Sequence, residues 1–155
     1  MTDGVSGCKF CEIIKSKKEL HLRESEKCIV IKDIKPKAPQ HFLVLTKVHI
    51  AKPTDLTIHD IDLLKEMEKL GREYLRLELK EKGEADIVED MLRVGFHWPP
   101  MIRVDHLHLH FIYPIKELGF MSKFLTFRPG KVFKPLSQVI EDIKKKADET
   151  PNVKP

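Results

Sequence analysis

Three histidines alternate with apolar residues in the segment His106-Leu-His-Leu-His110. Successive side chains of a β-strand point to opposite faces, so a strand over residues 105–113 would place all three imidazoles on one face and the leucines on the other. Three titratable rings make an unfavourable core, because each needs a hydrogen-bonding partner and their protonation would bring like charges together. The segment therefore predicts a β-strand with an apolar face and a histidine face.

Three interpretations of this histidine face compete. The first is a polar stripe that faces solvent and has no role, which the apolar neighbours disfavour. The second is a metal site, because two histidines separated by one residue in a strand can share a zinc ion. The third is nucleophilic catalysis at phosphorus, in which a neutral imidazole forms a covalent phosphohistidine while its neighbours bind the anion and donate a proton. Spacing alone does not separate the last two.

The composition fits one domain. With 155 residues, 41% of them hydrophobic, the chain suits a single moderate core and is too apolar for a disordered protein. The net charge of +4 suits small anionic ligands and does not by itself indicate nucleic acid. We expect a single domain over residues 8–147, between a flexible N-terminus, residues 1–7, and a flexible tail, residues 148–155.

The sequence also bears on location. Its apolar runs are too short to cross a membrane, and residues 1–7 lack the basic and apolar regions of a secretory signal. Three cysteines without such a signal predict a reducing compartment. We therefore expect the protein in the cytoplasm, with the nucleus as a second location.

Hydrophobic periodicity predicts an α+β fold. Short helices are predicted over residues 10–17 and 138–147, and a long amphipathic helix over residues 58–83, with Thr57 as its N-cap and Gly83 as its stop. Strands are predicted over residues 20–25, 27–33, 41–47, 91–96 and 105–113, and residues 114–135 are predicted to be irregular. This order favours a largely antiparallel sheet packed on the long helix, with a short C-terminal helix.

The residues around the histidines resemble the signature of the histidine-triad hydrolases and transferases. The segment His106-Leu-His-Leu-His-Phe-Ile112 matches the family pattern of three histidines alternating with apolar residues. Three upstream segments match in order and spacing: Cys8-Lys-Phe-Cys-Glu-Ile-Ile14, Asp33-Ile-Lys-Pro-Lys-Ala-Pro-Gln-His-Phe-Leu-Val-Leu45 and Lys47-Val-His-Ile50. The likeness runs from about residue 8 to residue 143 and is to the Hint branch, the nucleoside phosphoramidases. Two further segments, Gly95-Phe-His-Trp-Pro-Pro100 and Glu117-Leu-Gly-Phe-Met-Ser-Lys123, are similar to its third type of adenosine 5′-monophosphoramidase, which lies near aprataxin.

This resemblance implies a hydrolase that needs no cofactor for catalysis. By the family pattern, His108 would attack the α-phosphorus of an adenosine 5′-phosphoramidate or acyl-adenylate, and water would then release AMP from the adenylyl-histidine. His110 would bind the phosphate, and His106 would hold the site from the other end of the strand. His41 would orient the nucleophile, with a buried structural histidine as the alternative.

The resemblance also implies a purine nucleotide site. Asp33 would accept hydrogen bonds from the ribose hydroxyls, since two carboxylate oxygens suit two neighbouring donors; a turn cap is the alternative. Four residues would form the apolar wall around the purine: Phe10, Ile13, Ile31 and Ile34. Ordinary core packing is the alternative for all four.

Two positions depart from the Hint pattern. Gly95 stands where many Hint proteins carry asparagine, and Arg103 where serine is frequent, so the expected help to the leaving amine is lost. Arg103 can still contact the phosphate as part of the nucleotide site. His97 and Trp98 are candidates to close over the site, with a rigid surface loop as the alternative.

The cysteines suggest a structural metal site. A lone Cys-x-x-Cys pair is a weak signal, because it also occurs in redox motifs and as buried cysteine. In several histidine-triad proteins, however, two such cysteines join two histidines around a zinc ion, which prefers four ligands. The matching set here is Cys8, Cys11, His49 and His106, with a reduced, packed cysteine pair as the alternative.

We expect a purine nucleotide conjugate as the small-molecule substrate and a homodimer as the assembly, with neither a membrane nor a nucleic acid as partner. One rival function is aprataxin-like removal of AMP from DNA 5′ ends, which usually involves an appended zinc finger; no cysteine follows Cys28 to build one. The other is a nucleotide-binding scaffold with weak catalysis. Gly95 and Arg103 favour the scaffold, and the intact triad opposes it.

Overall fold

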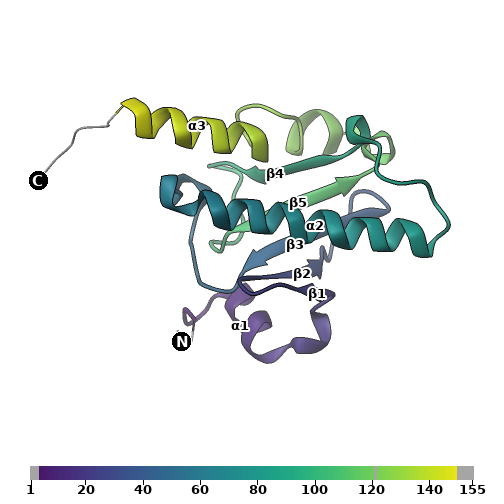
Figure 1. Cartoon of the computed structure of the whole chain (residues 1–155), viewed down its shortest axis with the longest axis horizontal. Helices are drawn as coiled ribbons and strands as arrows, with labels where there is room; N and C mark the ends of the chain where they lie inside the picture. The colour runs from purple at the N-terminus through teal and green to yellow at the C-terminus, as the bar shows by residue number, and fades with distance from the viewer. Residues whose placement is uncertain (1–3, 121, 150–155) are drawn as a thin grey trace, which may run out of the picture.

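Within residues 4–120 and 122–149, which the computed structural model describes, the chain forms one six-stranded antiparallel sheet (Figure 1). The strand order is β1-β2-β3-β5-β4-β6, and each neighbouring pair is antiparallel. The strands are β1 (Arg23–Glu24), β2 (Cys28–Lys32), β3 (Gln40–Thr46), β4 (Arg93–His97), β5 (His108–Tyr113) and β6 (Phe133–Pro135). The predicted α+β class with a largely antiparallel sheet is confirmed.

The long helix α2 (Ile61–Glu81) lies across one face of the sheet (Figure 1). A 3-10 turn over Ile58–Asp60 precedes it, and Thr57 caps this turn by accepting a hydrogen bond from the His59 amide while its own amide donates to the Asp60 carboxylate. Such a reciprocal capping box satisfies amides that a helix start would otherwise leave unpaired. The chain leaves the helix at Gly83, whose φ of +71° favours glycine.

Two shorter helices complete the fold. The N-terminal helix α1 (Lys9–Ser16) agrees with its prediction to within a residue. The C-terminal helix α3 (Leu136–Glu149) is confirmed but extends two residues further than predicted at each end. Residues 1–3 and 150–155 of the predicted flexible ends lie outside the described residues. No described helix is both long enough and apolar enough to span a membrane.

Alternation along β5 separates the core from the histidine face. Leu109 and Phe111 point into the main core under α2, together with apolar residues of β2 and β3. On the opposite face, His108 and His110 lie between two smaller apolar clusters. One cluster packs α1 on β2 and β3, and the other packs the 115–133 segment on the end of β5. The two clusters therefore form side walls around the histidines.

Three local predictions were wrong. The strand predicted over residues 105–113 begins only at His108, because its ladder with β3 starts at the Leu45–His108 pair. The strand predicted over residues 20–25 is reduced to β1, since residues 18–20 satisfy their backbone groups in a 3-10 turn instead. Residues 114–135 are not irregular throughout: they contain a π-helical turn, Ser122–Thr126, and the edge strand β6. Pro135 is tolerated in β6 because an edge strand can do without one donor.

Packing explains why position 95 is glycine. A Cβ atom there would lie 2.4 Å from the Lys134 carbonyl oxygen and 2.7 Å from the Phe133 ring. Both neighbours belong to β6, which pairs with β4 at Gly95. The space that an asparagine side chain would need is therefore filled by the chain's own edge strand.

We predict that Gly95→Ala destabilises the protein by about 1–3 kcal/mol, because the new methyl group overpacks a site closed by backbone. Gly119→Ala is the matched control, since a Cβ at Gly119 would have no neighbour within 4 Å. Urea unfolding of the two variants measures the difference. Equal free energies of unfolding would contradict this account of Gly95.

Candidate active site

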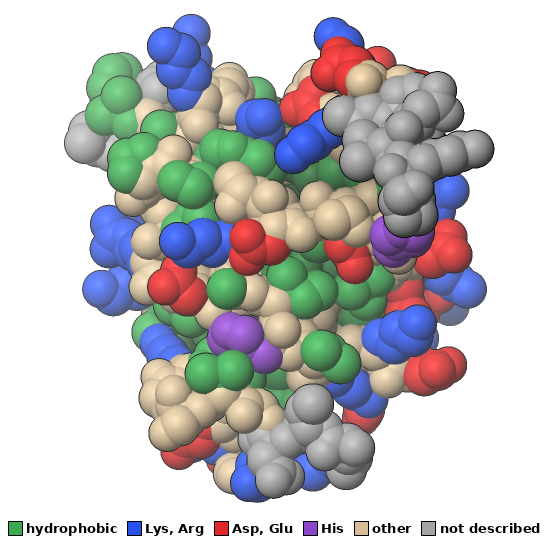
Figure 2. Space-filling model, turned by 90° about the vertical axis from the view of Figure 1, so that its left-hand side faces the viewer, with side chains coloured by type: hydrophobic (Ala, Val, Ile, Leu, Met, Phe, Trp, Pro, Cys, Tyr) green, Lys and Arg blue, Asp and Glu red, His purple; other side chains and the backbone are tan. Residues whose placement is uncertain are grey.

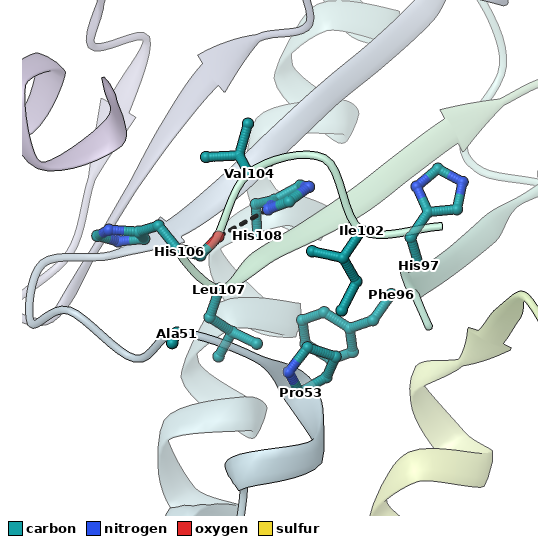
Figure 3. Close-up of a pocket in the computed structure, with 9 residues that line it drawn as sticks. All are labelled: Ala51, Pro53, Phe96, His97, Ile102, Val104, His106, Leu107 and His108. Carbon is teal, nitrogen blue, oxygen red and sulfur yellow. Dashed lines mark hydrogen bonds between the residues drawn. The ribbon is translucent and has the colours of Figure 1, made fainter. Parts of the chain in front are cut away.

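The backbone fixes the protonation pattern of the central histidine. His108, the half-buried first residue of β5, donates a hydrogen bond from Nδ1–H to the His106 carbonyl oxygen at 2.7 Å. Figure 3 shows this bond and places His108 between His106 on one side and His97 on the other. Burial lowers the pKa of His108, which keeps the ring neutral. The lone pair of the neutral ring therefore lies on Nε2, where it is available as a nucleophile or a base.

A second chain of hydrogen bonds fixes His41 and His110. The Lys37 amide donates to His41 Nδ1 at 3.0 Å, so the proton of neutral His41 lies on Nε2. That atom is 3.0 Å from His110 Nδ1 and 3.2 Å from an Asp33 carboxylate oxygen. Since His110 Nδ1 accepts from His41, the proton of His110 lies on Nε2. His110 Nε2 is buried and has no hydrogen-bonding partner among the described residues.

Burial keeps both of these rings neutral. The pKa of His41 is lowered to about 4, because desolvation outweighs the attraction of Asp33. Desolvation, and then the neighbouring rings of His108, His97 and His41, lowers the pKa of His110 well below its usual value. His110 thus offers a buried N–H donor, and such an unsatisfied group indicates a bound ligand or solvent. A phosphate oxygen is an acceptor that fits it.

The residues predicted to surround a purine are only partly brought together. The Phe10 ring stands edge-on to the His108 ring, with 5.2 Å between the centroids. Ile13 and Ile31 are buried in the same cluster as Phe10, whereas Ile34 is 76% exposed. The first three could form one wall beside His108, and Ile34 could reach a ligand only from the surface.

Asp33 forms the turn-cap contact that was the alternative prediction, and it also contacts two histidines, which the sequence did not predict. One carboxylate oxygen accepts a hydrogen bond from the Lys35 amide at 2.8 Å, as in the turn-cap alternative. The other oxygen lies beside His41 and, at 4.0 Å, His110. Asp33 therefore connects the end of β2 to the histidine pair, and it is still 17% exposed at its side chain.

His97 and Trp98 lie on opposite faces of the sheet. His97, the last residue of β4, donates from Nε2 to the Thr126 carbonyl at 2.9 Å, and its ring centroid is 4.7 Å from that of His110. Trp98 packs against the main core and lies under the Lys134 ammonium group, so the expectation that it closes over the site was wrong. Arg103 is exposed, and its charge contributes to the lowered pKa of His97, although burial is the larger cause.

Two phenylalanines complete the site wall and were missed in the sequence. The Phe127 ring lies 5.4 Å from His41 and 5.2 Å from His110, and the Phe133 ring lies 6.1 Å from His110, measured between centroids. Both come from the 115–133 segment, which has no helix or strand periodicity. The abundance of phenylalanine in that segment was the one available signal.

A small pocket opens beside His108 (Figure 3). Its imidazole rings are those of His97, His106 and His108. The remaining lining is mainly apolar: Ala51, Pro53, Phe96, Ile102, Val104 and Leu107. With a volume of about 10 Å³, this cavity has room for roughly one water molecule beside His108.

The four predicted metal ligands converge. The His106 Nδ1 atom lies 3.3 Å from Cys8 Sγ, 3.4 Å from Cys11 Sγ and 3.2 Å from His49 Nδ1. Tetrahedral zinc bound at about 2.0–2.3 Å holds its ligand atoms roughly 3.3–3.8 Å apart, so these separations nearly match. His106 Nε2 also donates to the Thr46 carbonyl at 2.8 Å, the outer contact that orients a ligating histidine. The cluster could hold a metal ion, and its mixture of sulfur and nitrogen donors suits zinc.

A second cluster is close in space but has the wrong surroundings for a metal. Asp33, His41 and His110 also place three potential ligand atoms together. A histidine that binds metal through Nε2 should donate its other N–H, yet Nδ1 of His41 faces the Lys37 amide donor. This cluster is therefore a hydrogen-bonded unit, in contrast to the cysteine-containing one.

The chain resembles proteins of known family. Residues 7–125 match the family model described as "Scavenger mRNA decapping enzyme C-term binding". The mouse adenosine 5′-monophosphoramidase HINT3 is 35% identical over 143 residues, which cover 90% of this chain and 83% of that protein. The Arabidopsis thaliana bifunctional adenosine 5′-phosphosulfate phosphorylase/adenylylsulfatase HINT4 is also 35% identical, over 88% of this chain and 91% of its own. Aprataxin of Ciona intestinalis is 37% identical, but over only 23% of its length.

Solved structures agree with these sequence matches. A HIT family hydrolase from Clostridium thermocellum superposes with a TM-score of 0.56 at 31% identity, covering 70% of this chain and 90% of that one. A HIT family hydrolase from Legionella pneumophila also gives a TM-score of 0.56, at 26% identity over 80% of this chain and all of that one. Both likenesses confirm the predicted fold.

We predict that acid destabilises the protein through His41 and His110. Their folded-state pKa values lie below the value of about 6.5 expected in the unfolded chain. The stability gained from keeping them neutral is therefore present above about pH 6.5 and is lost as the pH falls toward the folded pKa values. For His41, whose folded-state pKa is about 4, a change from about pH 7 to about pH 5 should lower the free energy of unfolding by roughly 1–2 kcal/mol, and His110 adds to the loss in the same direction.

Urea unfolding at the two pH values measures this loss. A chelator is present throughout, so that metal release makes no contribution. An unchanged free energy of unfolding would contradict the neutral, buried assignment of the two rings.

Proposed function

Because the chain belongs to the histidine-triad superfamily, we propose that it hydrolyses adenosine 5′-phosphoramidates or acyl-adenylates to AMP through an adenylyl intermediate on His108. The observation that supports this most is the pairing of two atoms on one strand face. His108 Nε2 carries a lone pair, and the neighbouring His110 Nε2 carries a buried proton without a partner. Attack at phosphorus needs a nucleophile next to a group that can donate a hydrogen bond to the phosphate oxygens.

The first step breaks the phosphorus–nitrogen bond. His108 Nε2 attacks the α-phosphorus, the bond to the leaving nitrogen breaks, and the departing amine takes a proton from water. Throughout this step the His106 carbonyl holds the proton on His108 Nδ1, so that the positive charge forming on the ring is shared with a hydrogen-bond acceptor. His110 Nε2–H donates to a phosphate oxygen, and His41 keeps His110 in that tautomer.

The second step regenerates the ring. Water attacks the phosphorus of the adenylyl-histidine, the bond to His108 Nε2 breaks, and AMP leaves with the hydroxyl group of the water, whose remaining proton neutralises the hydroxide formed in the first step. Phe10, Ile13 and Ile31 would hold the purine, with Ile34 at the surface, while Asp33 would bind the ribose and Arg103 the phosphate. The partial exposure of the Asp33 side chain supports its part in this assignment.

Neither rival function gains support. The aprataxin match covers a small part of that protein, and on the face drawn in Figure 2 positive and negative side chains are interspersed rather than gathered into a basic tract. The scaffold alternative relied on Gly95 and Arg103; the packing of β6 gives Gly95 a structural reason, and the intact triad still opposes this alternative. The homodimer stays a prediction. The outer strands β1 and β6 are two and three residues long, so exposed parts of α2 such as Leu77 are the better candidate surface.

We predict that His108→Ala lowers the rate of AMP release from a fluorogenic adenosine phosphoramidate by about 1,000-fold or more, because the substitution removes the Nε2 lone pair that is proposed to attack phosphorus. His59→Ala is the control, since this exposed histidine lies outside the pocket and should leave the rate unchanged. Activity that survives His108→Ala would exclude the proposed nucleophile. An adenylated nicked DNA, assayed in parallel, should be the poorer substrate; preference for it would favour the rival enzyme.

We further propose that the ion held by the cysteine-containing cluster is structural zinc. Cys8 is the N-cap of α1 and already accepts the Cys11 amide through its sulfur, so the ion would fasten α1 to the segments that carry His49 and His106. The geometry of the four donors supports the ion, and zinc would supply rigidity here rather than chemistry.

Metal analysis of protein purified without chelator should find one zinc per chain. Cys11→Ser should lose it, because three ligands bind zinc far more weakly than four. Cys28→Ala should keep it, since Cys28 is buried in the main core under α2. Zinc retained by Cys11→Ser at the wild-type level would contradict the assigned ligands.

A further inference from the structure

A groove of about 580 Å³ lies between α3 and the segment that leads into α2. In Figure 1, α3 runs beside the start of α2. The apolar lining of the groove includes Leu56, Trp98, Val139 and Ile143, and all four pack against the main core. The groove therefore lies on the side of the sheet that the helices cover, away from the histidine face.

Two apolar side chains of this groove are left partly open. Trp98 is half-buried, and the Lys134 ammonium group lies 4.4 Å from the centroid of its ring. Ile58, another lining residue, is 43% exposed. A tryptophan set in a concave apolar surface is typical of sites at which proteins contact one another, because its burial contributes much of the binding energy. The groove thus has the composition of an interface.

The charges along the groove are complementary to themselves. Asp142 and Lys146 both line it and lie about one helical turn apart on α3. Lys134 and Gln138 contact the Asp142 carboxylate at 3.1 and 2.8 Å, and the Asp142 side chain is still 42% exposed. A two-fold axis between the two positions would bring Lys146 of the partner subunit next to Asp142, and symmetry would form the reverse pair. A second copy of this chain therefore matches the groove in charge as well as in apolarity.

We propose that this groove is the contact surface between two copies of the chain, which associate about a two-fold axis with their α3 helices antiparallel. Trp98, Val139 and Ile143 would form the apolar centre of the contact. Asp142 and Lys146 would form reciprocal charge pairs at its edges. The inference names a surface for the predicted homodimer and does not depend on the proposed reaction.

The exposed part of α2 offers less for such a contact. Leu77 is 49% exposed, but it is surrounded on the helix by exposed charged residues: Arg76, Lys80 and Glu81. The centre of a protein interface is depleted of charge, and its aromatic content is high. The groove beside α3 meets both conditions, whereas the surface around Leu77 meets neither.

Sedimentation velocity and tryptophan fluorescence together test the proposal. Trp98 is the chain's only tryptophan, so its emission reports on the groove alone. We expect the wild-type chain to sediment as a dimer. When dilution dissociates the dimer, Trp98 emission should shift to longer wavelength, because the indole becomes exposed to water. A groove that instead serves a small ligand or another protein would leave the purified chain monomeric.

Charge reversal provides the sharpest variants. Asp142→Lys should weaken the dimer by about 10–100-fold, and so should Lys146→Asp, because symmetry turns both reciprocal pairs from attractive to repulsive. An equimolar mixture of the two variants should recover the wild-type affinity, since each copy then meets the opposite charge at both positions. Recovery on mixing cannot come from an effect within one chain. Leu77→Gln is the control for α2 and should leave the dimer intact.

The inference would be overturned by a wild-type chain that stays monomeric, by charge variants that dimerise as well as the wild type, or by a mixture that shows no recovery. Trp98 emission that stays unchanged when the dimer dissociates would also count against the groove. A dimer lost only in Leu77→Gln would place the contact on α2 instead. None of these results bears on the reaction at His108, which the phosphoramidate assay tests separately.

Discussion

The hydrogen bond from His108 Nδ1 to the His106 carbonyl is the interaction on which the rest of the site depends. It places the lone pair of a neutral imidazole on Nε2, the atom from which the proposed attack on phosphorus would come. The surrounding structure keeps the two residues in this relation. The β3–β5 ladder fixes His108 from one side, and the Thr46 carbonyl holds the His106 ring from the other.

The histidines of this site perform three different tasks because their hydrogen-bonding partners differ. A backbone acceptor leaves His108 with an unprotonated Nε2, the proposed nucleophilic atom. A backbone donor at Lys37 sets His41, which in turn leaves His110 with a buried N–H for an anion. Sulfur neighbours and a backbone acceptor at Thr46 make His106 a suitable metal ligand. The backbone donor or acceptor that each histidine contacts thus determines which of its ring nitrogens carries the proton.

Much of this could be predicted from the sequence because it is local. The alternation of residues 106–110 placed the histidines on one face, and helical periodicity located α2. What the sequence did not yield depends on contacts between distant segments. The start of β5 is set by its partner β3, Trp98 belongs to the core because β4 alternates faces, and Gly95 is required by a C-terminal edge strand with no recognisable pattern. Phe127 and Phe133 reach the site for the same reason.

Trapping the covalent intermediate tests the central claim most directly. Protein mixed briefly with an adenosine phosphoramidate, quenched and digested can be examined by mass spectrometry that preserves phosphorus–nitrogen bonds. We predict that the adenylyl group is found on His108, and that ³¹P–¹⁵N correlation places it on Nε2. An adenylyl group on another residue, or hydrolysis without any covalent intermediate, would contradict the account.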